Sequence, residues 1–282
     1  MRSGVEDKLL PVTNLEKLSS FKDLTKNFEK GAYSRVHKVI FRNHEIALKK
    51  MSLNDTPTLR VYNNEKHILD LLSRYLTNRY NLHIIRCYGY SEENLSSAFV
   101  AMGSFAFESA SITVSVYIEK NNFADLPRLY QIATETAIGL NYLHSFCSIV
   151  HGDIKSSNLM LDANFRVKII DFGFAQDLNN KINLVGGTPN YIAPEKWINQ
   201  SCTTKTDVYS FGILLFELFI QAPLYPEIKT EENLKKEVCN GKRPNHFLFF
   251  THPMRELMDE CWDQDPEKRP NMHEVEVKLK AW

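Results

Sequence analysis

Residues 151–173 of this 282-residue chain, HGDIKSSNLMLDANFRVKIIDFG, are the stretch that decides its fold. Two apolar segments, Leu159–Leu161 and Val167–Ile170, lie on either side of a polar turn at 162–164. Short apolar runs around an Asp/Asn turn are typical of two strands joined as a hairpin. Because Asn158 precedes the first strand and Asp171 follows the second, an antiparallel hairpin brings these two side chains together at its open end.

The polar residues beside this hairpin form a candidate metal site. Asp153 lies five residues before Asn158, and Lys155 stands between them. Carboxylate and amide oxygens suit Mg²⁺, which takes few protein ligands and completes its shell with water and substrate phosphates. The alternative is that Asp153, Asn158 and Asp171 only shape the local turns. The convergence of three such residues next to a lysine favours the site.

A second candidate site lies earlier, in the segment 58–76. Its apolar residues Val61, Ile68 and Leu72 recur at helical spacing, and Glu65 falls within the same stripe. A buried carboxylate is costly unless a cation pairs with it. The candidate cation is Lys49, at the end of the strand-like segment 46–49, IALK. The alternative is that Glu65 lies at the rim of the helix.

The order of the predicted elements indicates an α+β fold of two lobes. Strands are expected over 22–53, with a polar turn at 42–44, and over 82–105. Helices are expected after the first third of the chain, over 127–146, 207–220, 231–239, 252–263 and 272–280. We expect a loose N-terminal arm at 1–20 and one domain at 21–282, with an N-lobe at about 21–104 and a C-lobe at about 105–282.

The composition excludes several function classes. The chain has 34 Lys plus Arg and 34 Asp plus Glu, so it lacks the basic excess of a general nucleic-acid binder. The longest apolar run, Phe211–Ile220, is short and contains Glu217, which predicts a buried helix and no membrane span. Five scattered cysteines and no apolar leader favour a reducing compartment. We expect a cytoplasmic location, in the cell that makes the protein or in a second cell that receives it.

Together these segments resemble the protein kinase family. The segment 46–49 is similar to the strand that carries the nucleotide-binding lysine, and 151–158 is similar to the catalytic loop. The family's DFG and APE motifs are intact at 171–173 and 193–195. Three further similarities are the segments 187–191 and 206–212 and Arg269, which matches the arginine that pairs with the APE glutamate. The resemblance implies a bilobal protein kinase fold, with a small antiparallel β-rich N-lobe holding one helix and a larger, mostly helical C-lobe.

The resemblance also implies roles for individual residues, with ATP and Mg²⁺ as the groups they handle. Lys49 would hold the α- and β-phosphates, and Glu65 would orient Lys49. Asn158 and Asp171 would bind Mg²⁺. Asp153 would accept the proton of the substrate hydroxyl, and Lys155 would steady the γ-phosphoryl group. The remaining nucleotide-contacting positions that it implies are Gly31, Val36, Ala47, Met102 and Met160. His151 is expected to be a structural core histidine.

The branch of the family follows from smaller similarities. Lys155 and Thr188 look like those of serine/threonine kinases. The dipeptide Cys261-Trp262 and the helix from Asp207 to Leu218 look like those of the tyrosine-kinase-like branch. We therefore expect a Ser/Thr kinase that acts on protein substrates, with phosphotyrosine as the result that would contradict it.

Two departures from the family pattern affect this expectation. In the phosphate loop, at 29–36, only Gly31 of the usual glycines is present, and Glu29 adds a negative charge. Gly152 replaces the arginine that in the family pairs with a phosphate on the activation segment. Residues 174–187 contain no Ser, Thr or Tyr. We therefore expect no activation by phosphorylation within 174–187; the alternative is that Gly152 is neutral drift.

The connection between the lobes is expected at 98–105, with Ala101 or Met102 guarding the back of the nucleotide pocket and no acidic residue in the stretch. The first C-lobe helix is expected at 109–119. Two alternative functions stay open: a pseudokinase scaffold or switch with weakened ATP binding, and a small-molecule phosphotransferase. Regulation would come from the catalytic core, from the N-terminal arm or from a regulatory protein partner.

Overall fold

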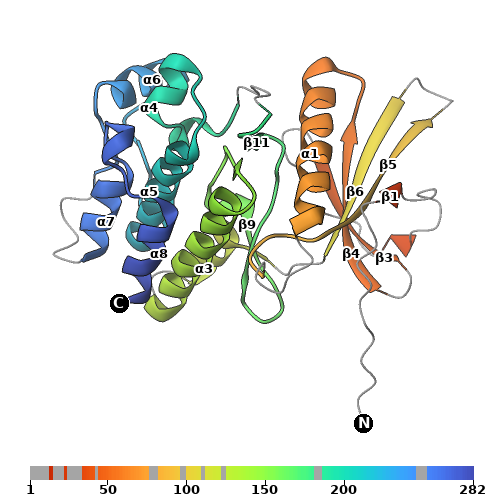
Figure 1. Ribbon diagram of the computed structural model, residues 1–282, viewed down its shortest axis with the longest axis horizontal. Helices are drawn as coiled ribbons and strands as arrows, with labels where there is room; N and C mark the ends of the chain where they lie inside the picture. The colour runs from red at the N-terminus through yellow and green to blue at the C-terminus, as the bar shows by residue number, and fades with distance from the viewer. Residues whose placement is uncertain are drawn as a thin grey trace, which may run out of the picture. The chain divides into compact units, whose positions relative to one another are not determined.

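The computed structural model of the chain describes residues 13–14, 22–23, 34–41, 44–75, 82–95, 100–108, 112–121, 125–180, 186–245 and 253–282 (Figure 1). The chain forms two compact units. The first comprises Met1–Tyr80 and Ile85–Ser109, and the second comprises Asn81–Ile84 and Ala110–Trp282. None of the described helices has both the length and the apolar character that crossing a membrane requires.

The first unit is a mixed sheet accompanied by one helix. Its strands are β1 (Thr13–Asn14), β2 (Lys22–Asp23), β3 (Ser34–Phe41), β4 (His44–Ser52), β5 (Cys87–Leu95) and β6 (Val100–Glu108), in the order β1-β5-β6-β4-β3-β2. All neighbours pair antiparallel except β1 and β5, which are parallel. The β-branched and aromatic content of 34–52 favours these strands. Within the expected loose arm, Thr13 pairs with Gly89, so part of the arm belongs to the sheet.

The helix α1 (Thr56–Tyr75) begins at a capping aspartate. Asp55 accepts a hydrogen bond from the backbone N–H of Thr58 at 2.8 Å, and this bond is the main reason that the pKa of Asp55 is lowered. The expected stripe is buried: Val61, Ile68 and Leu72 are at most 6% exposed. The helical periodicity of 58–76 is therefore confirmed, and its apolar face is the one on which Glu65 lies.

The second unit is mostly helical, with short strands on either side of the loop that contains Asp153. Its helices are α2 (Val114–Asn121), α3 (Leu126–Ser145), α4 (Pro194–Asn199), α5 (Thr204–Ile220), α6 (Glu231–Cys239), α7 (Pro253–Cys261) and α8 (Met272–Lys280). Its strands form two small sheets: β7 (Ile112–Thr113), β9 (Leu159–Leu161) and β10 (Val167–Ile169) in one, and β8 (Ile149–Val150) with β11 (Gln176–Asp177) in the other. This agrees with the expected helical remainder.

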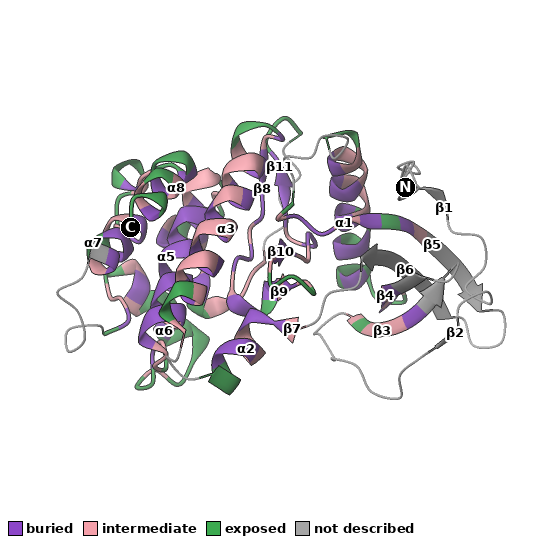
Figure 2. Ribbon diagram, turned by 90° about the horizontal axis from the view of Figure 1, so that it is seen from below, coloured by how far each residue is buried: buried purple, intermediate pink, exposed green. Residues whose placement is uncertain are grey.

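Helix α5 is the centre of the second unit. Most of its residues are buried on every side, as the dominant buried colour along it shows (Figure 2). A helix that is apolar all round belongs in a core, so the buried helix expected from the run 211–220 is confirmed. Thr203 caps its start by accepting from the N–H of Lys205. Gln221, with φ of 52°, ends it in the left-handed conformation.

The expected connection at 98–105 is wrong. Residues 100–108 form one continuous strand, β6, and Met102 lies opposite Ser52 of β4 and Glu93 of β5. The chain passes from the first unit to the second after Ser109, so the expected boundary at 104/105 falls inside β6. The strand ends at Glu108. This acidic residue lies just beyond 98–105, the stretch that contains none. The next helix, α2, begins at Val114 instead of 109.

Candidate active site

In the first unit, Lys49 and Glu65 form a buried ion pair. Lys49 Nζ donates to Glu65 Oε1 at 2.8 Å and to Oε2 at 2.7 Å. Glu65 has no exposed surface, and Lys49 is 8% exposed. The expected pairing is therefore confirmed, and the rim interpretation of Glu65 is wrong. Since β4 is paired on both sides and α1 is packed by its apolar stripe, the lysine is held in one orientation.

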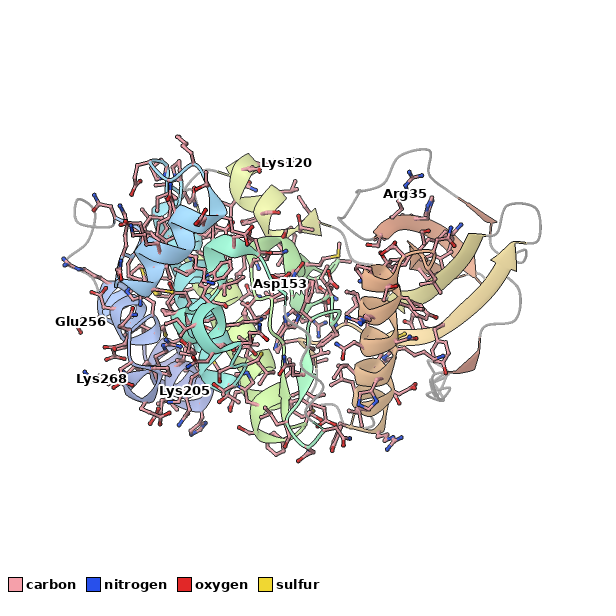
Figure 3. All side chains as sticks on the ribbon, turned by 90° about the horizontal axis from the view of Figure 1, so that it is seen from above. Arg35, Lys120, Asp153, Lys205, Glu256 and Lys268 are labelled. Carbon is pink, nitrogen blue, oxygen red and sulfur yellow. The ribbon has the colours of Figure 1, made fainter. Side chains whose placement is uncertain are left out.

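In the second unit, hydrogen bonds gather around Asp153, which is labelled in Figure 3. Asn158 Nδ2 donates to the Asp153 carbonyl at 2.8 Å and to Asp153 Oδ2 at 2.9 Å. Lys155 Nζ lies 2.9 Å from the same Oδ2 and donates to Thr188 Oγ1 at 2.5 Å. The three residues Asp153, Lys155 and Asn158 are thus brought together, as expected from their spacing.

The second oxygen of Asp153 has a different environment. Asp153 is 5% exposed, and its Oδ1 is buried with no hydrogen-bond partner in the described structure. A buried carboxylate oxygen without a donor is costly, and such a group in a native fold requires an explanation. A hydroxyl donor bound at this oxygen would satisfy it. Because Oδ2 is already occupied by Lys155 and Asn158, the arrangement offers one acceptor to a ligand.

The backbone before Asp153 is fixed by Asp207 of α5. Asp207 Oδ2 accepts from the N–H of His151 at 2.7 Å, and Oδ1 accepts from the N–H of Gly152 at 2.8 Å. His144 Nε2 lies 2.8 Å from Oδ2. Burial opposes ionisation of Asp207, but the hydrogen bond and charge of His144 and the N–H of Gly152 outweigh it, so its pKa is lowered. His151 is fully buried, in agreement with a structural role.

The hairpin expected from 159–170 is confirmed. Strands β9 and β10 are antiparallel, with Leu161 opposite Val167 and Leu159 opposite Ile169. The N–H of Ile170 donates to the Asn158 carbonyl at 3.0 Å, which brings the end of β10 beside the start of β9. Asp171 follows with φ of 66°, a left-handed conformation that non-glycine residues seldom adopt and that is often found at functional sites.

The donor set at this end of the hairpin fits a magnesium ion. Asn158 supplies an amide oxygen and Asp171 a carboxylate, and both are hard ligands. Among the described residues, no three of His, Cys, Asp or Glu lie close enough to form a metal cluster alone. A cation held by Asn158 and Asp171 would take its other ligands from water and phosphate, which is the coordination typical of Mg²⁺.

The segment after the DFG motif is anchored by Glu195. Arg269 donates to Glu195 through Nη1 at 2.7 Å and Nη2 at 2.9 Å, a bidentate pair. Arg269 is 1% exposed, and its guanidinium lies 5.1 Å from the ring centroid of Tyr209. The pairing implied by the family resemblance is thus present.

Sequence reasoning missed the role of Glu217. Its carboxylate accepts from the hydroxyl of Tyr191 at 2.7 Å and from that of Ser156 in the catalytic loop. It therefore ties the catalytic loop to the turn at Pro189–Tyr191. Burial and the Glu217 charge raise the pKa of Tyr191. The signal was available, because Glu217 is the one charged residue in the apolar run 211–220.

Of the other positions predicted to contact the nucleotide, some lie in described strands and others lie outside the described residues. Val36 in β3 lies opposite Lys49 in β4, and Ala47 is half-buried two residues before that lysine. Met160 in β9 lies opposite Thr113 of β7. Gly31 and Glu29 of the expected phosphate loop lie outside the described residues. Met102, expected at the connection, lies inside β6, as described above.

Comparisons with known proteins agree with this geometry. Residues 24–278 match the family described as protein kinase domain. The chain is 30% identical over 261 residues to dual specificity protein kinase shkE of Dictyostelium discoideum, covering 88% of this chain and 35% of that protein. It is 37% identical over 158 residues to shkD, another dual specificity protein kinase of that organism, covering 54% of this chain and 21% of shkD. It is 27% identical over 288 residues to RGS domain-containing serine/threonine-protein kinase A of the same organism, covering 100% of this chain and 24% of that relative. The chain thus spans about a third or less of these relatives.

Proposed function

This chain belongs to the protein kinase family, and from that membership we propose that it transfers the γ-phosphate of ATP to serine and threonine hydroxyls of protein substrates. The observation that carries the proposal is the environment of Asp153. One of its carboxylate oxygens is held by Lys155 and Asn158, and the other is buried without a donor. A substrate hydroxyl is the donor that this second oxygen is arranged to receive.

In the proposed phosphate transfer, Asp153 and Lys155 have separate roles. Asp153 Oδ1 accepts the hydrogen of the substrate hydroxyl and aligns its oxygen for in-line attack on the γ-phosphorus. The new O–P bond forms as the bond to the β-phosphate oxygen breaks, so phosphorylated protein and ADP are the products. Lys155, beside Asp153 Oδ2, places its positive charge where the transferring group develops negative charge. Positioning and charge neutralisation supply most of the rate.

The residues proposed to hold nucleotide and metal are those that the family resemblance implies. Lys49, oriented by Glu65, binds the α- and β-phosphates, and Val36, Ala47 and Met160 line the nucleotide. Asn158 and Asp171 are the residues that would hold Mg²⁺. When bound, the ion neutralises phosphate charge.

The choice of serine and threonine over tyrosine rests on Lys155 and Thr188. Lys155 Nζ lies 2.9 Å from Asp153 Oδ2 and donates to Thr188 Oγ1 at 2.5 Å, so the two residues lie beside the proposed proton acceptor. Relatives are named both serine/threonine and dual specificity kinases. Phosphoamino-acid analysis of a generic protein substrate is expected to give phosphoserine and phosphothreonine. Mainly phosphotyrosine would contradict the assignment.

Two alternatives are less well supported. A pseudokinase scaffold has no need to retain the buried Lys49–Glu65 pair or the unpartnered oxygen of Asp153. A small-molecule phosphotransferase has no need for the segment anchored by Glu195 and Arg269, which in protein kinases supports a protein substrate. Transfer of label from ATP to protein by the wild type but not by Asp153→Ala or Lys49→Met supports the proposal, and equal transfer by wild type and Asp153→Ala refutes it.

We further propose that residues 21–282 form the kinase domain, with protein substrates, no nucleic-acid ligand and a cytoplasmic location. The five cysteines are all free. Burial raises the pKa of both Cys87 and Cys147 to about 12, so these thiols stay protonated and unreactive. Free, unpaired thiols are typical of a reducing compartment. A regulatory protein partner acting on the catalytic core remains part of this proposal.

A further inference from the structure

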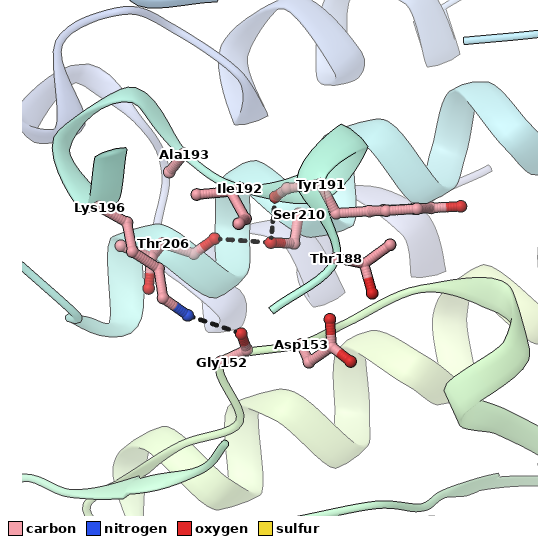
Figure 4. Close-up of a pocket in the computed structure, with 9 residues that line it drawn as sticks. All are labelled: Gly152, Asp153, Thr188, Tyr191, Ile192, Ala193, Lys196, Thr206 and Ser210. Atoms are coloured by element: carbon pink, nitrogen blue, oxygen red, sulfur yellow. Dashed lines mark hydrogen bonds between the residues drawn. The ribbon is translucent and has the colours of Figure 1, made fainter. Parts of the chain in front are cut away.

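The carbonyl of Gly152, the residue directly before Asp153, is bound by a buried cation. Lys196 Nζ donates to this oxygen at 2.7 Å (Figure 4). Lys196 lies in α4 and is 7% exposed. Among the residues that the structure describes, its ammonium has this one hydrogen-bond partner and no ion-pair partner. Burying an ammonium against one neutral oxygen is unfavourable for stability, so its retention indicates another role.

The ammonium of Lys196 lies next to the position that a Cβ at residue 152 would occupy. A Cβ added to Gly152 would be 3.5 Å from Lys196 Nζ and only 2.5 Å from the carbonyl oxygen of Phe174. Gly152 also has φ of 78°, which favours glycine. The site therefore has no room for an arginine at 152. A positive charge reaches it instead from α4.

Three segments meet at this carbonyl. Gly187, at the end of the segment 174–187, has φ of 134°, and a Cβ there would be 3.2 Å from the Gly152 oxygen. Lys196 comes from α4, whose neighbouring residue Glu195 is fixed by Arg269. The catalytic loop, the end of the activation segment and an anchored helix are thus joined at one atom.

The backbone of Gly152, the residue before Asp153, is held at both of its polar groups. Its N–H side is fixed because Asp207 accepts from the N–H of Gly152, and its carbonyl side is fixed because Lys196 donates to the Gly152 oxygen. The Gly152 carbonyl belongs to the peptide bond that joins Gly152 to Asp153. Rotation of this peptide would move the Asp153 backbone. We propose that Lys196 is a positioning residue, which orients Asp153 through the Gly152 carbonyl and so holds the catalytic loop without a phosphate on 174–187. Its effect on rate rests on the proposed function, whereas its effect on loop order does not.

Three variants test this role. Lys196→Met removes the donor and keeps an unbranched side chain, and Lys196→Arg keeps the charge and the donors. Lys236→Met, at an exposed position of α6, is the matched control. We expect Lys196→Met to lower kcat about tenfold to hundredfold, because small displacements of a catalytic group are costly. The KM for ATP is expected to stay within about twofold of wild type, because the substitution removes no contact proposed to bind ATP. Lys196→Arg should recover most of the rate, and Lys236→Met should match wild type.

Hydrogen exchange of the segment 150–158 gives a readout that does not need activity. Lys196→Met should exchange faster there than wild type, while Lys196→Arg and Lys236→Met should not. If wild type transfers no phosphate, the proposed function fails and the exchange measurement still tests the lysine. Unchanged exchange in Lys196→Met overturns the positioning role, as does an unchanged kcat, or a loss of rate equal to the loss of folded protein.

Discussion

Both carboxylate oxygens of Glu65 accept from Lys49 Nζ, at 2.8 and 2.7 Å, and the glutamate has no exposed surface. The pair joins α1 to β4 inside the first unit. Two charges removed from water stabilise each other only while both are present. The relationship therefore makes separate predictions for stability and for nucleotide use.

Lys49→Met is expected to lower the free energy of unfolding by about 3–5 kcal/mol, because it leaves the Glu65 carboxylate buried and uncompensated. Lys49→Met combined with Glu65→Leu should regain most of that loss but not ATP binding. Urea unfolding and nucleotide titration measure the two effects. Lys50→Met, at the next position of β4, is the control and should retain both properties. A double variant that binds ATP like wild type would contradict the role of Lys49.

Arg269→Ala is expected to destabilise the second unit by about 3–5 kcal/mol, because Glu195 would lose its bidentate partner and a buried guanidinium site would be left empty. Thermal unfolding checks this, with exposed Lys268→Ala as the neighbouring control. Because α4 carries Lys196, activity should also fall in Arg269→Ala. A variant as stable as wild type would show that the pair contributes little.

Asp207 predicts a pH dependence of stability. Its pKa is lower in the folded state than the unfolded value of about 3.9. A lowered carboxyl pKa contributes stability that is fully present above the unfolded value and is lost as the pH falls through the folded value. Asp207→Asn should therefore be less stable than wild type at pH 7, and the difference should shrink below about pH 4. Urea unfolding at both pH values measures this; a difference that grows with acid contradicts it.

Gly152→Arg restores the residue that the family usually has, yet it is expected to abolish activity. The first atom of any side chain at 152 would lie 2.5 Å from the Phe174 carbonyl oxygen.

Conversely, treating the wild type with a phosphatase should leave its activity unchanged. Phosphate transfer assays before and after treatment check both statements. Loss of activity that maps to dephosphorylation of Thr188 or Tyr191 would count against independence from phosphorylation.

The sequence was most informative where local pattern and chemistry coincide. The hairpin around 159–170 and the helical stripe on which Glu65 lies followed from the sequence pattern, because each depends on residues close in the chain. The burial of Glu65 against Lys49 was one of two alternatives, and the structure decides between them. The division between the units did not. The apolar and aromatic residues of β6 continue past 105 to Phe107, so the local pattern does not mark a boundary at 104/105; pairing with β4 and β5 shows that the strand runs on to Glu108.

Other features depended on contacts between distant segments. Ile84 pairs with Ile169, and His83 Nδ1 lies 3.2 Å from the Val167 carbonyl, so residues 81–84 belong to the second unit although their neighbours belong to the first. The Lys196–Gly152 contact is of the same kind. No spacing rule links these residues, because the contact exists only once α4 and the catalytic loop are folded.

The central claim is that Asp153 Oδ1 receives the substrate hydroxyl, and Asp153→Asn tests it most directly. This substitution keeps the size of the side chain and removes the proton acceptor. Single-turnover transfer from ATP to a protein substrate should fall about 10²–10⁴-fold, while the thermal midpoint stays near that of wild type. Ser157→Ala, at an exposed position of the same loop, should transfer like wild type. Transfer by Asp153→Asn at the wild-type rate would contradict the account.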